Sequence, residues 1–415
     1  MPQIEYHQHI AGPEAVKHVA QGEALAAINL PPGLARVLQE RQRISGSDET
    51  DALYFEDAQI LDVSEGEDHW TRGKAAVQRM VQAYTPNTRF VPTSYGVDAA
   101  TAFISGVIRE PDSSDDEMHF ALGLKRDARG VWRIALEYAT VKPPLEFPEP
   151  ITADRTIQAL DDAGIRRGVV LSLGYWFGDG TETDTASEHA HVRAENDWVV
   201  KEVNRYPNRL VAFCGVNPLR DYALAELDRC SRLPNVKGMK LHFGNSRIDV
   251  RNAQHLARLR EFFKAANGKH MAIVVHLWTF DRTYGREHSQ IFLDSILPMA
   301  PDVTVQIAHM AGAGRYVHDD AMAVFAEAAQ RKDPRMKNVY VDLATVVTES
   351  QTDSTIALIT KRIRQVGVDH VLFGADAPVL NRPRPLQAWA TIRRRLPLSD
   401  DELRTIATNV ARYMR

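Results

Sequence analysis

The sequence predicts an α/β protein built on a (β/α)8 (TIM) barrel, with a separate α+β domain inserted after the first strand. Three observations support this prediction. Short apolar runs alternate with helix-like segments along most of the chain, several of these runs end in histidine or aspartate, and the alternation is interrupted between residues 23 and 140. The carboxyl ends of the strands carry the active site in such barrels, so polar strand ends are the candidate functional residues.

Length and composition indicate an ordinary globular protein. The chain has 415 residues, of which 44% are hydrophobic and 25% charged, enough for a large core. The net charge of -4 gives no reason to expect nucleic acid as a partner. We expect a cytoplasmic protein without a membrane partner, because no apolar run is long enough to span a bilayer and no leader precedes the first strand. The two cysteines, Cys214 and Cys230, are expected to be reduced.

Residues 4–10 (IEYHQHI) form the first predicted strand and contain a His-x-His pair. Alternate side chains of a strand share a face, which places His7 and His9 on one face, roughly 6.6 Å apart along the strand. Two imidazoles in this arrangement can bind one cation, or they can be two half-exposed polar residues of a terminal strand. The pair therefore needs support from other strands.

The segment of residues 23–140 has a different pattern, in which helices precede a run of strands. We predict helices at residues 34–44 and 73–84, a passage from helix into strand at 51–62, and strands at 89–95, 100–109, 118–125 and 131–141. Helices followed by a sheet are typical of an α+β domain. A proline-rich linker at residues 141–150 follows it, since the prolines favour extended chain.

Residues 151–415 return to the alternation that begins in residues 1–22. After a helix at residues 152–163, strands are predicted at residues 168–173, 210–216, 237–242, 271–276, 303–309, 338–343 and 370–376. With the first strand they number eight, the count of a closed barrel. Three of the runs end in His276, His309 and Asp376. Parallel strands present their carboxyl ends at one edge, so these side chains are expected near His7 and His9.

The inserted segment resembles NTF2-like domains of the SnoaL type. Three stretches carry the resemblance, ALYFEDA at residues 52–58, WTRGKAA at 70–76 and KRDARGVWRI at 125–134. The resemblance implies a domain that encloses a pocket. We expect it to serve as a lid, a dimer surface or a determinant of specificity.

The rest of the chain resembles the amidohydrolase superfamily, and within it the amidohydrolase-related group that includes aminocarboxymuconate-semialdehyde decarboxylase. The resemblance rests on the His-x-His pair, on His276 and His309, on Asp376 within FGADAP, and on the closing segment LRTIATNVAR. It implies that His7, His9, His276 and Asp376 bind one divalent metal and that His309 faces the reacting group. Zinc is the expected metal, with manganese and iron left open. Asp376 and His309 are the expected catalytic residues, because a carboxylate beside the metal can take a proton from its water.

Four further residues are expected to contact substrate. Lys240 and His242 share a strand face, and Lys240 either binds a substrate carboxylate or oxyanion or, once carboxylated, bridges two metals. Trp278 lies just past His276. Arg315, in the loop after His309, is placed to hold a carboxylate through two hydrogen bonds.

Three functions follow from these patterns. The first is a metal-dependent hydrolase that cleaves an amide, lactone or ester bond with a metal-activated water. The second is a metal-dependent, non-oxidative decarboxylase of a small unsaturated or aromatic carboxylic acid. The third is a small-molecule binding protein that uses the NTF2-like pocket, which the ligand set opposes because inward histidines and aspartates are costly to bury without a metal. We expect the hydrolase, a small-molecule substrate, and either a monomer or a homodimer.

Overall fold

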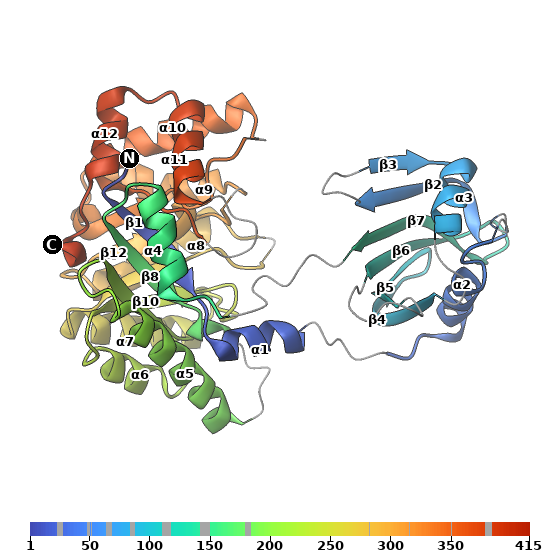
Figure 1. Ribbon diagram of the computed structural model, residues 1–415, viewed down its shortest axis with the longest axis horizontal. Helices are drawn as coiled ribbons and strands as arrows, with labels where there is room; N and C mark the ends of the chain where they lie inside the picture. The colour runs from blue at the N-terminus through green and yellow to red at the C-terminus, as the bar shows by residue number, and fades with distance from the viewer. Residues whose placement is uncertain are drawn as a thin grey trace. The chain divides into compact units, whose positions relative to one another are not determined.

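The structure is a computed structural model that describes all residues except 23–27, 48–49, 51, 64–68, 84–87, 110–117, 142–149, 179–183, 282, 315, 350 and 378–383. The chain divides into two compact units (Figure 1). The barrel unit comprises Met1–Val19 and Glu146–Arg415, and the second unit comprises Ala20–Leu145. The predicted linker lies outside the described residues apart from its two ends, residues 141 and 150.

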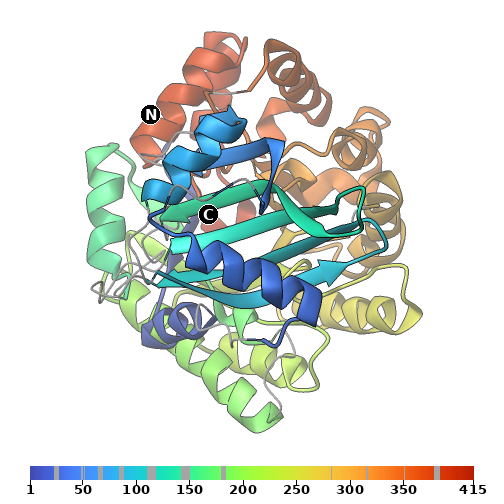
Figure 2. The same cartoon turned by 90° about the vertical axis from the view of Figure 1, so that its right-hand side faces the viewer.

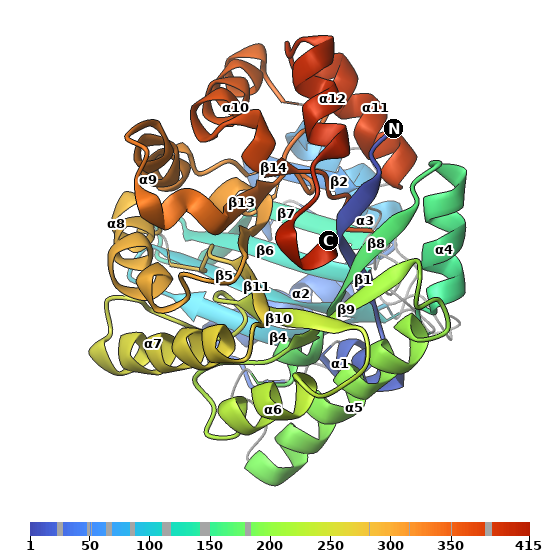
Figure 3. The ribbon, with the colours of Figure 1, turned by 90° about the vertical axis from the view of Figure 1, so that its left-hand side faces the viewer.

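The barrel unit is a ring of eight parallel strands surrounded by helices, as Figure 3 shows. The strands pair in the order β1 (Ile4–Ile10), β8 (Arg167–Ser172), β9 (Leu210–Gly215), β10 (Val236–His242), β11 (Ala272–His276), β12 (Val305–Ile307), β13 (Val339–Asp342) and β14 (Val371–Leu372). The chain after β14 returns to β1, since Tyr6 N–H donates to the Phe373 carbonyl (3.0 Å) and Asp376 N–H to the His7 carbonyl (2.8 Å). The predicted (β/α)8 barrel is thus confirmed.

The strands form because their apolar runs are buried on both faces. All six residues of β9 (LVAFCG) are buried, the pattern of a parallel strand between the barrel interior and the outer helices. Gly238 in β10 allows the strands to approach closely. A Cβ atom there would lie 2.2 Å from the Ala272 carbonyl oxygen and 2.3 Å from the Phe213 ring, so this position requires glycine.

Helices connect the strands and cover the outside of the barrel. They are α1 (Pro13–Gly22), α4 (Ala153–Asp162), α5 (Thr185–Val203), α6 (Ala223–Cys230), α7 (Ala253–Gly268), α8 (Arg286–Ile291), α9 (Asp319–Gln330), α10 (Asp353–Val366), α11 (Pro385–Arg395) and α12 (Asp400–Thr408). Polar N-caps fix where several begin. Asp184 precedes α5, Asn252 precedes α7 and Thr352 precedes α10, and each side chain accepts a backbone N–H of the first turn. No helix among the described residues is both long and apolar enough to span a bilayer.

Two barrel strands end two or more residues before their predicted ends. β12 stops at Ile307, where the 3-10 turn Ala308–Ala311 begins, and β14 stops at Leu372. His309 and Asp376 therefore lie beyond the strands rather than at their last positions. The reason is conformational, because both residues have left-handed backbone angles (φ 53° and 61°), which a strand cannot contain.

The cysteines form a disulfide, so the expectation of two reduced thiols is wrong in this structure. Cys214 lies on β9 and Cys230 at the end of α6. Their Cα atoms are 6.5 Å apart, within the range that a disulfide spans. The pairing could not be predicted from the sequence, because it depends on how α6 packs against the strand.

The second unit is an α+β fold with a six-stranded sheet. The order is β3 (His69–Arg72), β2 (Tyr54–Val63), β7 (Trp132–Val141), β6 (Met118–Arg126), β5 (Thr101–Arg109) and β4 (Arg89–Val97), with β2 and β7 parallel and the other neighbours antiparallel. α2 (Pro32–Arg43) lies across the sheet (Figure 2), and α3 (Lys74–Ala83) packs on β2. The helix expected before β2 is absent from the described part of that stretch, where residues 52–53 form a turn. The resemblance to NTF2-like domains stays a prediction.

Candidate metal centre

The His-x-His pair and Asp376 converge at the carboxyl end of the barrel strands. The Nε2 atoms of His7 and His9 lie 3.5 and 3.2 Å from the same oxygen, Asp376 Oδ1. All three side chains are buried, with exposed fractions of 1%, 4% and 6%. Ligands bound about 2.0–2.2 Å from one ion lie about this far apart. These three side chains are therefore placed to share one metal ion.

Hydrogen bonds fix how each imidazole faces Asp376. His9 Nδ1 donates to the Leu171 carbonyl (2.8 Å), and His7 Nδ1 lies 3.0 Å from Asp342 Oδ2. A carbonyl or carboxylate oxygen only accepts, so Nδ1 carries the hydrogen in both neutral rings and Nε2 keeps its lone pair toward Asp376. Burial and the nearby Lys240 ammonium lower the pKa of His7 to about 3, which keeps this ring neutral.

Backbone contacts place Asp376 against β1. Its N–H donates to the His7 carbonyl (2.8 Å), and the neighbouring Ala375 N–H donates to Glu5 Oε1 (2.6 Å). Glu5 Oε2 also accepts the His7 N–H (3.1 Å), so one buried carboxyl group holds β1 and the Asp376 segment together. Burial raises the pKa of Glu5 well above its usual value. Gly374 makes room for this packing, since a Cβ atom there would lie 2.8 Å from His7 Cβ.

Asp342, at the end of β13, joins the site although we did not predict it. Besides its contact with His7, it accepts the backbone N–H of His309 (2.9 Å) and the side-chain amide of Gln306 (2.7 Å). Burial by itself raises the pKa of Asp342, but His7 and His309 hold that pKa well below the usual value. A signal was present in the sequence, because Asp342 is the one acidic residue of the strand predicted at residues 338–343 and lies next to its end.

A second group of imidazoles lines the same region. Ring centroids lie 4.0 Å apart for His242 and His276, and 4.7 Å apart for both His276–His309 and His7–His309. Burial and the neighbouring rings hold the pKa of His276 well below its usual value. The geometry brings all the histidines predicted for the site together. His276 nevertheless lies outside the group of His7, His9 and Asp376, whose ligand atoms are within 4.8 Å of one another.

The donor set fits a divalent metal. Imidazoles and a carboxylate are the ligands that zinc and similar ions take in proteins. Nε2 of His276 is buried and has no hydrogen-bond partner among the described residues. A buried nitrogen without a partner is costly, and a metal ion would satisfy it.

His309 lies in a strained turn that aims its ring into the site. His309, Met310 and Ala311 are consecutive residues with positive φ (53°, 50° and 61°), and Thr345 after β13 has the same conformation (φ 55°). His309 Nδ1 donates to the Ala344 carbonyl (2.7 Å). Burial lowers the pKa of His309, so the neutral ring offers Nε2 as a proton acceptor.

Lys240 lies inside the cluster and not at its rim. Its Nζ is 3.4 Å from His7 Nε2, and its side chain is buried. No carboxylate among the described residues lies within ion-pair distance of Nζ. Burial lowers the pKa of Lys240 to about 8, which leaves it mostly protonated at neutral pH.

The remaining predicted substrate residues fall in different places. His242 Nδ1 accepts the Asn245 N–H (3.1 Å), and its ring stacks on Tyr175, a residue that sequence patterns did not suggest, with centroids 5.1 Å apart. Trp278 is half-buried, 6.2 Å from the His276 ring. Arg315 lies outside the described residues.

Comparison with known proteins adds a family. The family model described as Amidohydrolase matches residues 173–412, more than half of the chain. No curated protein matches the sequence. Similar solved structures include a 2,6-dihydroxybenzoate decarboxylase from Rhizobium (14% identity, TM-score 0.44, covering 61% of this chain and 85% of that chain). A second is a dihydroxybenzoic acid decarboxylase from Polaromonas sp. JS666 with bound manganese and 2-nitroresorcinol (15% identity, TM-score 0.44, covering 61% of this chain and 83% of that chain). A third is a proposed amidohydrolase from Staphylococcus aureus (16% identity, TM-score 0.46, covering 63% of this chain and 90% of that chain). At these identities the similarity says nothing of the reaction of this chain.

Proposed function

The chain belongs to the amidohydrolase family, and from this we propose that its barrel unit is a metal-dependent hydrolase that cleaves an amide, lactone or ester bond of a small molecule. The observation that carries the proposal is the convergence of His7 Nε2, His9 Nε2 and Asp376 Oδ1. We propose these residues as metal ligands, with Nε2 of His276, which has no partner among the described residues, as a fourth. The bound ion, for which we propose zinc, would supply a Lewis acid and activate water.

His309 is placed to accept the proton that hydrolysis removes from water. Its single ring hydrogen is engaged with the Ala344 carbonyl, so the neutral ring can take a proton at Nε2 but has none to give there. Hydrolysis needs a group that accepts a proton from water. Replacing the carboxylate of an aromatic acid by hydrogen needs a group that delivers a proton to carbon. Asp376 and His309 would share the proton-accepting role, and the proton that they take from water would pass to the leaving group.

Decarboxylation of a small carboxylic acid is the second candidate, and Lys240 is the observation that favours it. A buried ammonium group without a carboxylate partner in the described structure attracts an anionic substrate. An acid held by Lys240 could lose carbon dioxide, and it could equally be the carboxylate end of a hydrolysed substrate. Product analysis separates the two reactions.

The test combines metal content, products and one matched pair of variants. Purified protein should contain about one equivalent of divalent metal, and a substrate screen in oxygen-18 water should label a carboxylate product without releasing carbon dioxide. His309→Asn should keep the metal and lower turnover by about 10²- to 10⁴-fold. His270→Asn is the control, because His270 has a similar left-handed backbone (φ 57°) but lies exposed before β11.

Two results would remove the proposal. Protein that contains less than about a tenth of an equivalent of metal and is indifferent to chelators has no metal-dependent reaction. Release of carbon dioxide, with no oxygen-18 in a carboxylate product, would identify a decarboxylase instead.

A further inference from the structure

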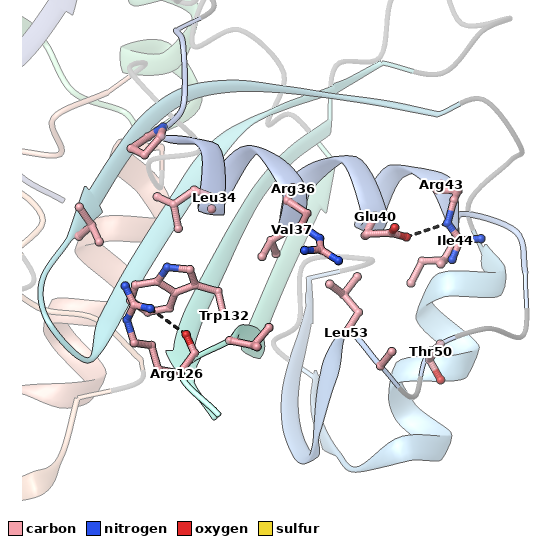
Figure 4. Close-up of a pocket in the computed structure, with 16 residues that line it drawn as sticks. Leu34, Arg36, Val37, Glu40, Arg43, Ile44, Thr50, Leu53, Arg126 and Trp132 are labelled. Atoms are coloured by element: carbon pink, nitrogen blue, oxygen red, sulfur yellow. Dashed lines mark hydrogen bonds and ion pairs between the residues drawn. The ribbon is translucent and has the colours of Figure 1, made fainter. Parts of the chain in front are cut away.

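The second unit contains a large groove beside α2. The groove has a volume of about 960 Å³, within the range of small-molecule sites. One wall is the side of α2 that carries Gly33, Arg36, Glu40 and Arg43, and Figure 4 shows the side chains of the last three along the helix. The facing wall is the segment before β2 and the β6–β7 turn, which contribute Thr50, Ala52, Leu53, Arg126, Gly130, Val131 and Trp132.

This groove is separate from the interior of the unit. Arg41 and Glu137 occupy the interior as a fully buried ion pair, with Arg41 Nε 3.0 Å from both carboxylate oxygens. The hydroxyl of Tyr54 donates to the same carboxylate. These groups satisfy one another and do not line the groove. Its chemistry is therefore set by the lining residues alone.

The groove has an apolar floor that reaches the surface. Leu34, Val37 and Trp132 are buried and form its base. Val97 and Val131 are about half exposed (52% and 53%), although valine is more often buried. Exposed apolar side chains next to a concavity indicate a binding surface.

The charges of the groove are mostly positive, and one of them has no partner among the described residues. Arg43 Nε pairs with Glu40 Oε2 (2.7 Å), and the Arg126 guanidinium lies 4.2 Å from the centre of the Trp132 ring while it donates to the Gly130 carbonyl (2.7 Å). Arg36 has no hydrogen bond or ion pair with any residue that the structure describes. In Figure 4 its guanidinium extends from α2 toward Leu53 across the groove. A protein with a net charge of -4 thus concentrates three arginines against one glutamate here.

We propose that this groove binds a small carboxylic acid with an aromatic body. The aromatic part would pack on the apolar floor beside Trp132, and the carboxylate would take the two parallel hydrogen bonds that the Arg36 guanidinium can donate. A guanidinium recognises a planar carboxylate through such a pair of bonds, and the apolar lining excludes a purely polar anion. This site is independent of the hydrolase proposed for the barrel.

The experiment measures binding of 2-naphthoate and of the neutral 2-naphthamide to the full-length, metal-loaded protein by calorimetry. We expect 2-naphthoate to bind at least tenfold more tightly than the amide. Arg36→Gln should weaken binding of 2-naphthoate by about tenfold, as expected for a charge-assisted hydrogen bond, and leave binding of 2-naphthamide unchanged. Ala52→Phe, which fills the groove from an exposed position, should weaken both compounds.

Arg129→Gln is the matched control, because Arg129 is an exposed arginine of the same β6–β7 turn that does not line the groove. It should bind 2-naphthoate like the unmodified protein. If 2-naphthoate also binds in the barrel unit, calorimetry gives a second isotherm, and Arg36→Gln should not change it. The proposal is overturned if no saturable binding occurs below about 1 mM, if acid and amide bind equally, or if Arg36→Gln and Ala52→Phe leave all binding intact. The proposal is also overturned if sedimentation shows that the chain dimerises and that Ala52→Phe abolishes the dimer.

Discussion

Glu195 is a buried carboxyl group whose protonation should control the stability of the barrel unit. Both of its oxygens lie 3.0 Å from the Gly12 N–H, at the start of α1. Burial raises the pKa of Glu195 from 4.5 to about 8. Between pH 4.5 and about 8 the folded protein therefore keeps a proton that the unfolded chain has released. The free energy of unfolding should fall as pH rises through this window. The slope is on the order of 1.4 kcal/mol per pH unit.

Glu195→Gln should remove this slope, because the amide keeps an acceptor for Gly12 and does not titrate. Urea unfolding of both proteins between about pH 5 and 8 measures it. Glu287→Gln, an exposed change on α8, should keep the slope of the unmodified protein. Parallel stability curves for the unmodified protein and Glu195→Gln would show that Glu195 is ionised in the folded state.

Single residues also mark the limit of prediction from sequence. His7 and His9 could be placed together because strand alternation is a local rule, and Asp376 because strand ends meet at one edge. The deep position of Lys240 beside His7 could not be predicted, since it depends on how far β10 reaches into the barrel. The turns that carry His309 and Asp376 could not be predicted for another reason. Their positive φ angles accompany tertiary contacts, such as the hydrogen bond from the His309 N–H to Asp342, which the local sequence does not show.

At the scale of elements, the contact between α6 and β9 can be tested through its disulfide. The denatured, unreduced protein should show no free thiol toward a thiol-reactive dye, since Cys214 and Cys230 are the two cysteines of the chain. Reduction, or replacement of both cysteines by alanine, should lower the free energy of unfolding by about 3 kcal/mol, the value for a loop of this length. Urea unfolding with and without reductant measures the difference.

Two titratable thiols in the denatured protein would restore the expectation drawn from the sequence. They would also agree with a cytoplasmic location, because structural disulfides are rare in reducing compartments. The disulfide of the structure and the expected cytoplasmic location disagree, and the number of thiols titrated in the denatured protein decides between them.

At the scale of the whole molecule, the two units have separate cores. Among the residues that the structure describes, the buried apolar clusters of the barrel contain none of 20–145, and the buried cluster of the second unit lies within residues 34–134. Replacing residues 23–140 by a short linker should therefore leave the barrel folded and its metal content unchanged. We expect KM to rise or the substrate range to widen, as for loss of a lid.

Metal analysis, thermal unfolding and steady-state kinetics of the shortened protein check this prediction. Unchanged KM values across the substrate set would rule out the lid. Loss of a cooperative unfolding transition would show that the barrel depends on the second unit. A division of the chain was predicted from the point where helix and strand alternation stops and resumes, whereas the groove beside α2 could not be predicted, because it depends on the packing of side chains from distant segments.

The left-handed residues around the candidate metal centre bear on how such a protein can adapt to heat. Each of His309, Met310, Ala311, Thr345 and Asp376 costs the folded state on the order of 1 kcal/mol. Selection for thermostability alone would replace some of them with glycine, which adopts positive φ without strain. Each replacement would also loosen the turn that aims a histidine or an aspartate into the candidate metal centre. Lineages of this chain that move to hotter habitats should therefore gain stability in the outer helices and keep the strained turns, because the turns are where tolerance to heat and catalytic power compete.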